Sequence, residues 1–141
     1  PLHFSQRANA VMREQESGGS ILFIGSVSAL RPSPGTAAYG AAKAGLMSLA
    51  TSLAVEWAPR VRVNCIVPGL VRTELSHLHY GDEAGLARVA TTIPLGRLAD
   101  PRDVGDACLF FASSLAGYVT GSTLLVHGGG ERPAFLAAAR S

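Results

Sequence analysis

SVSALRPSPGTAAYGAAK, residues 26–43, joins an apolar, strand-like run to a long alanine-rich stretch. Within it, Tyr39 and Lys43 are spaced i and i+4, so a helix would place both side chains on one face, with Cβ atoms roughly 5–6 Å apart. An ammonium held that close to a phenol favours the phenolate, which suits the phenol to donating and accepting protons. Ser26 comes before the helix, and we expect its hydroxyl to face the phenol across a pocket.

The sequence around this stretch favours a functional role over a chance surface pair. Taken alone, a Tyr-x-x-x-Lys pair is typical of an amphipathic helix surface. Here, however, the apolar run Ser20–Gly25 comes directly before Ser26, and a second run, Val61–Val67, ends in Pro68-Gly69. Apolar runs of this length are typical of parallel strands that are buried on both faces.

The remaining segments predict an α/β fold. We expect a third strand over Ser122–His127 and helices over Leu2–Gln15, Thr36–Trp57 and Arg102–Ser113, the last capped by Asp100-Pro101. The stretch Ser76–Thr92 is weakly helical and has no clean apolar stripe, so we interpret it as a mobile lid. Strands that alternate with helices indicate a parallel sheet with right-handed crossovers.

Three elements occur in the order and at the spacing of a known family: Ser26, Tyr39-x-x-x-Lys43 and Asn64-x-x-x-Pro68-Gly69. On these motifs the chain resembles the catalytic half of a short-chain dehydrogenase/reductase, from about Ser5 to Gly129. The resemblance implies an α/β fold that is the C-terminal part of a doubly wound Rossmann-type sheet with three parallel strands. It also implies one partial domain over residues 1–141, of which residues 131–141 are a C-terminal tail.

The resemblance further implies an oxidoreductase that transfers hydride between NAD(H) or NADP(H) and a carbonyl compound or secondary alcohol. Tyr39 would be the general acid/base, and Ser26 would position the substrate oxygen. Lys43 would favour the phenolate and hold the nicotinamide ribose. The implied cofactor-binding residues are Tyr39, Lys43, Pro68, Gly69, Val71 and Thr73, with the N–H of Val71 at the nicotinamide carboxamide.

Three positions carry alternatives. Ser28 competes with Ser26, but the family favours the longer spacing to Tyr39. Asn64 either contacts the ligand or bonds a neighbouring loop. His127 stands where the family often has an acid before the final glycines.

One part of the family pattern has no counterpart in the sequence. Dinucleotide binding uses a glycine-rich turn after the first strand, whereas the run Gly128–Gly130 follows the last strand, where we interpret it as a flexible exit. The family's Asn-Ala-Gly stretch and the helix asparagine of its proton relay are also absent. We therefore expect the C-terminal half of a longer family member, which alone is inactive and lacks affinity for NAD or NADP. The alternative is a non-catalytic remnant that acts as an interaction or oligomerisation fragment.

Composition argues against several other classes. With a net charge of +2 and no run of Lys or Arg, we expect no nucleic-acid partner, and we interpret Arg60 and Arg62 as part of a solvated rim. No apolar run is long enough for a membrane helix, and the N-terminus lacks a signal-sequence pattern. Cys65 and Cys108 fit neither CxxC nor zinc spacing, so we expect free thiols, no metal site and a cytoplasmic protein.

We expect a small ketone or alcohol as substrate and further copies of the chain as partners. The lid-region residues Leu70, Val71, Leu75 and Leu78 favour an apolar substrate. The helices Leu2–Gln15 and Thr36–Trp57 resemble the pair that family members pack between subunits, with Gly40, Ala44 and Ser48 on the close-packing face. The strand Ser122–His127 resembles the one used at their second interface. We therefore predict a homo-oligomer, a dimer or tetramer, whose tail lies on a neighbouring subunit, covers the lid or is disordered.

Overall fold

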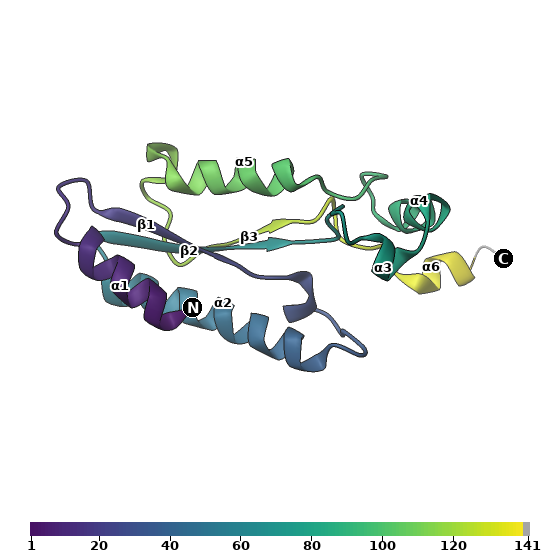
Figure 1. The fold of residues 1–141 in the computed structure, drawn as a ribbon, viewed down its shortest axis with the longest axis horizontal. Helices are drawn as coiled ribbons and strands as arrows, with labels where there is room; N and C mark the ends of the chain where they lie inside the picture. The colour runs from purple at the N-terminus through teal and green to yellow at the C-terminus, as the bar shows by residue number, and fades with distance from the viewer. Residues whose placement is uncertain (140–141) are drawn as a thin grey trace.

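A three-stranded parallel sheet forms the centre of the computed structural model, which describes residues 1–139 (Figure 1). The strands are β1 (Gly19–Ile24), β2 (Val61–Pro68) and β3 (Thr123–Val126), and β2 lies between the other two. No strand among the described residues pairs with the outer edge of β1 or of β3. Because both faces of β2 are covered, its interior is almost continuously apolar, as expected for a central parallel strand. The predicted parallel α/β sheet is confirmed.

Helices cover both faces of the sheet. On one face lie α1 (Leu2–Met12) and α2 (Ala37–Trp57), and on the other lies α5 (Pro101–Ala112) (Figure 1). Side chains alternate between the faces along each strand, so Val63 and Cys65 pack with Leu53 of α2, whereas Ile66 packs with Phe111 of α5. The sheet is therefore the middle of three layers.

The start of α5 carries the capping signal that the sequence predicts. The Asp100 carboxylate accepts a 2.9 Å hydrogen bond from the Arg102 N–H, and Asp103 accepts a 2.7 Å bond from the Asp100 N–H. Pro101 occupies the first turn, where a missing N–H costs nothing. The hydrogen-bonded Arg97 guanidinium, 2.6 Å from Asp103, lowers the pKa of that carboxyl to about 2. This end of α5 is thus well defined by local interactions.

The segment predicted as one lid helix over Ser76–Thr92 is two helices instead. α3 (His77–Tyr80) ends at Gly81, whose φ of +78° lies in the left-handed region. α4 (Glu83–Thr92) begins after Asp82, whose carboxylate accepts a 2.9 Å bond from the Gly85 N–H. The Gly-Asp pair therefore ends one helix and caps the next. A Cβ on Gly85 would lie 1.9 Å from the Tyr80 carbonyl oxygen, so the turn requires glycine there.

The run Gly128–Gly130, predicted as a flexible exit, is a packed turn. All three glycines have positive φ, which explains why glycine occupies each position. The Leu95 N–H donates to the Gly128 carbonyl at 3.1 Å, and a Cβ on Gly129 would lie 2.9 Å from the Pro94 ring. The turn is therefore held against the segment that follows α4.

The first residues of the tail are also bound to their own chain. Glu131 forms a 2.6 Å ion pair with Arg31, and the Arg132 N–H donates to the Thr92 carbonyl at 2.9 Å. The tail continues as the short helix α6 (Ala134–Ala138). Its last two residues, 140 and 141, lie outside the described residues.

Arg60 and Arg62, expected on a solvated rim, bind backbone carbonyl groups. Arg60 donates to the Gln15 carbonyl in the turn after α1, which ends earlier than predicted. Arg62 donates at 3.4 Å to the carbonyls of Val119 and of Ser113, which precedes the 3₁₀ helix η2 (Ser114–Ala116). Arg60 directly precedes β2 and Arg62 lies within it, so the two side chains tie the start of this strand to the segments that follow α1 and α5.

Candidate active site

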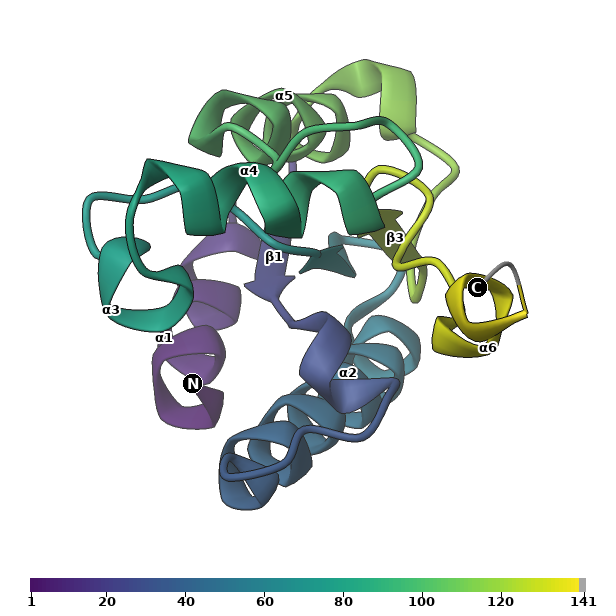
Figure 2. The same ribbon diagram turned by 90° about the vertical axis from the view of Figure 1, so that its right-hand side faces the viewer.

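The residues predicted to act in catalysis gather at the carboxyl end of β1. Ser26 follows that strand and precedes the 3₁₀ helix η1 (Val27–Ala29), while Tyr39 and Lys43 lie near the start of α2. The helices α3, α4 and α6 lie at the same end of the sheet (Figures 1 and 2). Open α/β sheets bind ligands just outside the carboxyl ends of their strands. The position of these residues therefore suits a ligand site.

Tyr39 and Lys43 lie together, as their spacing predicts. The Lys43 Nζ is 5.6 Å from the centroid of the Tyr39 ring and donates a 2.7 Å hydrogen bond to the carbonyl of Ile24, the last residue of β1. That bond anchors the ammonium between helix and strand and leaves its other N–H groups for a ligand. Tyr39 is 49% exposed, and its hydroxyl has no hydrogen-bond partner among the described residues. A ligand can therefore reach both groups.

The two candidate serines differ in their hydrogen bonds. Ser26 Oγ accepts a 3.2 Å bond from the Ser28 N–H, which caps η1 and leaves the Ser26 hydroxyl hydrogen free to donate. Ser28 Oγ accepts a 3.2 Å bond from Ser33 Oγ, which in turn lies 2.6 Å from Thr36 Oγ1. This network holds Ser28 within its own loop and favours Ser26 as the residue that meets a ligand.

Gly40 allows the start of α2 to approach the same loop. A Cβ at this position would lie 2.6 Å from the Ser28 carbonyl oxygen. The close approach at Gly40 is therefore made to a loop of the same chain, while the expected packing of Gly40, Ala44 and Ser48 between subunits stays a prediction. Gly45, by contrast, has no atom within 4 Å of its Cβ position.

Gly69 has a similar local role at the end of β2. Its N–H donates to the Val126 carbonyl at 2.9 Å, and an added Cβ would lie 2.7 Å from the Cβ of His127. Any larger residue would push the ends of β2 and β3 apart. Packing within the chain therefore requires the glycine of the Pro68-Gly69 pair, independently of any cofactor.

Val71 presents an unpaired backbone N–H. It forms a parallel bridge with Ala99 through bonds from the Arg72 N–H to the Ala99 carbonyl, at 2.8 Å, and from the Ala99 N–H to the Leu70 carbonyl, at 2.9 Å. In this pattern the N–H of Val71 points away from Ala99, and none of the described residues accepts a hydrogen bond from it. The group is thus available to a ligand.

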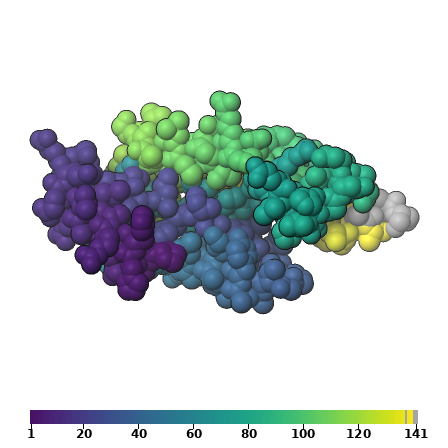
Figure 3. Space-filling model, in the orientation of Figure 1, coloured from purple at the N-terminus to yellow at the C-terminus, as the bar shows by residue number. Residues whose placement is uncertain are grey.

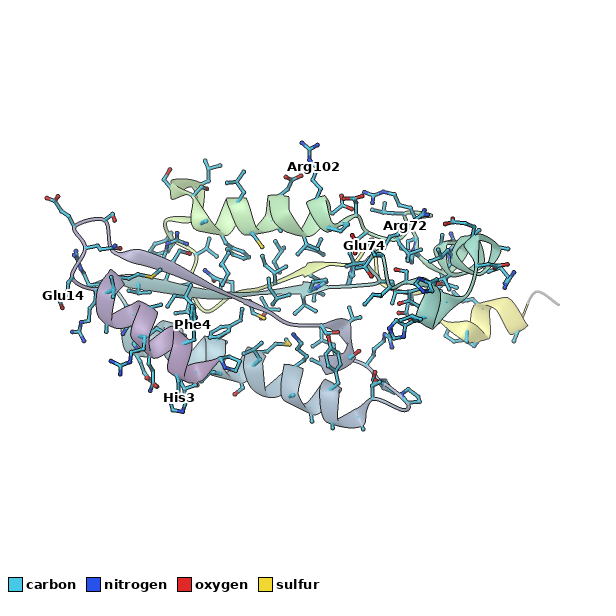
Figure 4. The ribbon with its side chains drawn as sticks, in the orientation of Figure 1. His3, Phe4, Glu14, Arg72, Glu74 and Arg102 are labelled. Atoms are coloured by element: carbon cyan, nitrogen blue, oxygen red, sulfur yellow. The ribbon has the colours of Figure 1, made fainter. Side chains whose placement is uncertain are left out.

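Thr73 is exposed and held in a turn by Ser76. The Thr73 N–H donates to Ser76 Oγ at 2.8 Å, and the buried Ser76, which the sequence analysis did not single out, fixes this turn. Arg72 and Glu74 flank Thr73 near the lid helices (Figure 4). Arg72 pairs with Glu83 of α4 at 2.7 Å, which ties the turn to that helix.

Asn64 bonds a neighbouring loop, which was one of its two predicted roles. Its side chain is fully buried, its Nδ2 donates to the Val119 carbonyl at 2.9 Å, and its Oδ1 accepts a 3.0 Å bond from the Ser122 N–H. Both hydrogen bonds of the Asn64 side-chain amide are made to the loop that leads into β3. Asn64 therefore positions a strand, and it does not belong to the candidate site.

Replacing Asn64 with Leu should lower the free energy of unfolding by roughly 1–3 kcal/mol, because the loop carbonyl and N–H lose their partners. Urea denaturation of the variant and the parent measures the difference. Asn9→Leu is the matched control. The buried Oδ1 of Asn9 has no hydrogen-bond partner, so its removal should not lower the free energy of unfolding in this way. Equal losses in the two variants would contradict the assigned role of Asn64.

An apolar cavity of about 260 Å³ lies beside the Ser26 segment. Its walls come from the loop of η1, the segment after β2, the end of α4 and the end of β3. The apolar side chains that line it are Val27, Leu30, Leu70, Ile93 and Leu125. Val27, which lines the cavity, directly follows Ser26, whereas the Ser26 side chain is not part of the lining.

Three polar side chains complete the wall of this cavity: Arg31, His127 and Glu131. Arg31 and Glu131 are the ion pair that binds the tail, and they are 100 positions apart in the sequence. Burial raises the pKa of the nearby Tyr80 of α3, and the Glu131 carboxylate raises it further against the opposing effect of Arg31. The α3–α4 segment, the η1 loop and the residues after β3 thus meet at this cavity, and no local sequence pattern predicted their contact.

The two cysteines are free thiols. Cys65 is buried beneath Gly25, and burial raises the pKa of both Cys65 and Cys108. Among residues 1–139, no three His, Cys, Asp or Glu side chains are grouped so as to hold a metal ion. Within the same range, no helix combines the length and apolar character needed to cross a membrane.

Comparison with known proteins identifies the family. A family model described as enoyl-(acyl carrier protein) reductase matches residues 1–131. Human dehydrogenase/reductase SDR family member 4 is 38% identical over 117 residues, which are 82% of this chain and 42% of that protein. L-rhamnose 1-dehydrogenase (NAD(P)(+)) from Azotobacter vinelandii is 39% identical over 125 residues, or 88% of this chain and 49% of that protein. The chain belongs to the short-chain dehydrogenase/reductase family.

Solved structures share the fold. 4-hydroxyisoleucine dehydrogenase complexed with NADH matches with a TM-score of 0.83 at 32% identity, over 92% of this chain and 54% of that one. Ligand-free aldohexose dehydrogenase from Thermoplasma acidophilum matches with a TM-score of 0.85 at 29% identity, over 91% and 53%. The Rossmann-type fold class is therefore confirmed. The chain spans about half the length of the curated relatives it matches.

Proposed function

We propose that the protein is an oxidoreductase that uses NAD(H) or NADP(H) to interconvert a carbonyl compound and a secondary alcohol. The observation that carries the proposal is the anchored pair on α2, in which the Lys43 ammonium bonds the Ile24 carbonyl at 2.7 Å and lies 5.6 Å from the Tyr39 ring. This pair combines an acid/base group with a fixed positive charge at the ligand-binding end of the sheet.

The chain's free polar groups fit the nicotinamide end of such a cofactor. The spare N–H groups of Lys43 suit ribose hydroxyls, and the unpaired N–H of Val71 suits a carboxamide oxygen. The other residues that we propose to line the cofactor are Tyr39, Pro68, Gly69 and Thr73. When bound, the cofactor supplies or accepts the hydride. Because the sequence has no glycine-rich turn after its first strand to hold a pyrophosphate, we propose that the chain by itself is inactive.

The side chains divide the remaining work. During reduction, Tyr39 gives its phenolic proton to the substrate oxygen, and during oxidation the phenolate takes that proton back. Lys43 stabilises the phenolate through its nearby charge. Ser26 donates a hydrogen bond to the same oxygen and so fixes its position. The adjoining cavity, lined largely by aliphatic side chains, favours a substrate with an apolar body.

Nicotinamide absorbance tests the proposal. The natural full-length protein is offered NADH or NADPH together with a panel of ketones of graded size and polarity. We expect oxidation of one of the two cofactors that depends on the ketone. Consumption of neither with any ketone would contradict the proposed activity.

We also propose that the protein is a homo-oligomer. Phe4 of α1 and Val55 of α2 have exposed fractions of 83% and 82%, and Leu109 of α5 has 69%. The helices α1 and α2 lie at the same surface (Figure 3), so a second copy on that surface would cover Phe4 and Val55, whereas Leu109 lies with α5 on the opposite side of the sheet. Light scattering of the 141-residue chain in dilute buffer should therefore give a mass above that of one chain. A stable 14.6 kDa monomer would contradict this.

The two free thiols bear on the compartment. Neither Cys65 nor Cys108 has a disulfide partner in the structure. Because disulfides are rare where glutathione keeps thiols reduced, we propose that the protein works in a reducing compartment such as the cytoplasm.

A further inference from the structure

His127 has both ring nitrogens uncommitted at the wall of the apolar cavity. The residue is half-buried at the end of β3, and neither Nδ1 nor Nε2 has a hydrogen-bond partner among the described residues. Arg31 and Glu131, the other polar side chains on this wall, are already joined at 2.6 Å. The imidazole is therefore the group that would gain most from a polar atom on a ligand.

The surroundings of His127 fix its position. Its Cβ packs where a side chain on Gly69 would have to go, and its Nε2 lies 3.8 Å from the Cβ position of Gly130. A neighbouring cavity of about 370 Å³ shares His127 with the first, together with Leu70, Ile93 and Leu125. The imidazole thus stands at the junction of two spaces that are otherwise mostly apolar.

We propose that His127 contacts the substrate and selects carbonyl compounds that carry a second oxygen function, such as a hydroxyl, on an apolar body. The inference rests on the proposed function. In this proposal a substrate whose reacting carbonyl meets Ser26 extends past Val27 into the cavity, whose lining includes both Val27 and His127. A site that desolvates a polar side chain disfavours a ligand that leaves the side chain without a partner.

The test uses the natural full-length protein and two matched series of increasing chain length, alkan-2-ones and the corresponding ω-hydroxyalkan-2-ones. The parent should prefer the hydroxyketone at the chain length that spans the cavity. His127→Leu should lower kcat/KM for that compound by about tenfold and leave the plain ketone nearly unchanged, as expected for the loss of one hydrogen bond. His127→Gln, which keeps a donor and an acceptor, should retain part of the preference.

The controls separate the possible failures. All variants at position 127 keep the Cβ that packs near Gly69. His3→Leu is the matched control, because it makes the same substitution on α1, where the side chain projects away from the sheet (Figure 4). Melting temperatures confirm folding, and the imidazole NMR signals of the parent, followed during titration with the hydroxyketone, should shift for His127. Equal losses for both ketone series, or no loss, would overturn the role of His127. Absence of turnover by the parent with every ketone would overturn the proposed function, and this inference with it.

Discussion

Replacing Tyr39 with Phe should lower kcat by roughly 10²–10⁴-fold and leave the dissociation constant of the nicotinamide cofactor nearly unchanged. The substitution removes the hydroxyl, which we propose carries the proton, but keeps the ring that lies 5.6 Å from the Lys43 ammonium. Steady-state rates and a fluorescence titration with reduced cofactor measure the two quantities separately.

Tyr118→Phe is the matched control for this experiment. Tyr118 is fully exposed on the turn after η2, so losing its hydroxyl should change neither the rate nor the cofactor affinity. If the Tyr39→Phe protein retained more than about half of the parent rate, Tyr39 would not be the proton donor. Loss of cofactor affinity alone would assign Tyr39 to binding.

Lys43→Ala should weaken turnover and cofactor affinity together, each by roughly 10–100-fold, the range expected for a charge-assisted hydrogen bond. We propose that the ammonium, anchored on the Ile24 carbonyl, both stabilises the Tyr39 phenolate and binds the nicotinamide ribose through its remaining N–H groups. The double loss distinguishes it from Tyr39→Phe, which should affect turnover alone.

Arg88→Ala is the control for the removed charge, because Arg88 is an exposed cation on α4. It should behave as the parent in both measurements. A Lys43→Ala protein that bound the cofactor normally would show that the ammonium serves only the phenol. One that turned over normally at saturating cofactor would contradict the role toward the phenol, and a variant normal in both measurements would contradict both roles.

The elements that the sequence analysis predicted correctly are those with strong local patterns. The buried apolar run of β2 and the Asp100-Pro101 cap of α5 depend on neighbouring residues, and both were recognisable before the structure. The break between α3 and α4 also had a local signal, the Gly81-Asp82 pair, but the weak helical pattern around it favoured a single helix. The assignment of residues 131–141 as a separate tail stays a prediction.

Contacts between distant segments could not be predicted in this way. The run Gly128–Gly130 was read as flexible, because nothing in it shows that Pro94 lies against it. The ion pair of Arg31 with Glu131 joins a loop to the tail, and the approach of Gly40 to Ser28 joins a helix to a loop. The chain therefore indicated which residues carry the proposed chemistry, but not which residues form the cavity beside them.

The bond between Lys43 and Ile24 also bears on the outer edge of β1. The N–H groups of Gly19 and Gly25 donate to the carbonyls of Arg60, just before β2, and of Ile66 within it. By alternation the peptide groups of Ser20, Leu22 and Ile24 face the outer edge of β1. The ammonium occupies the last of these carbonyls. A strand that added to this edge would find the Ile24 carbonyl already bonded to the ammonium, whereas the peptide groups of Ser20 and Leu22 face the edge without such a bond. The residue proposed to assist proton transfer thus also occupies one of the acceptors that the open edge presents.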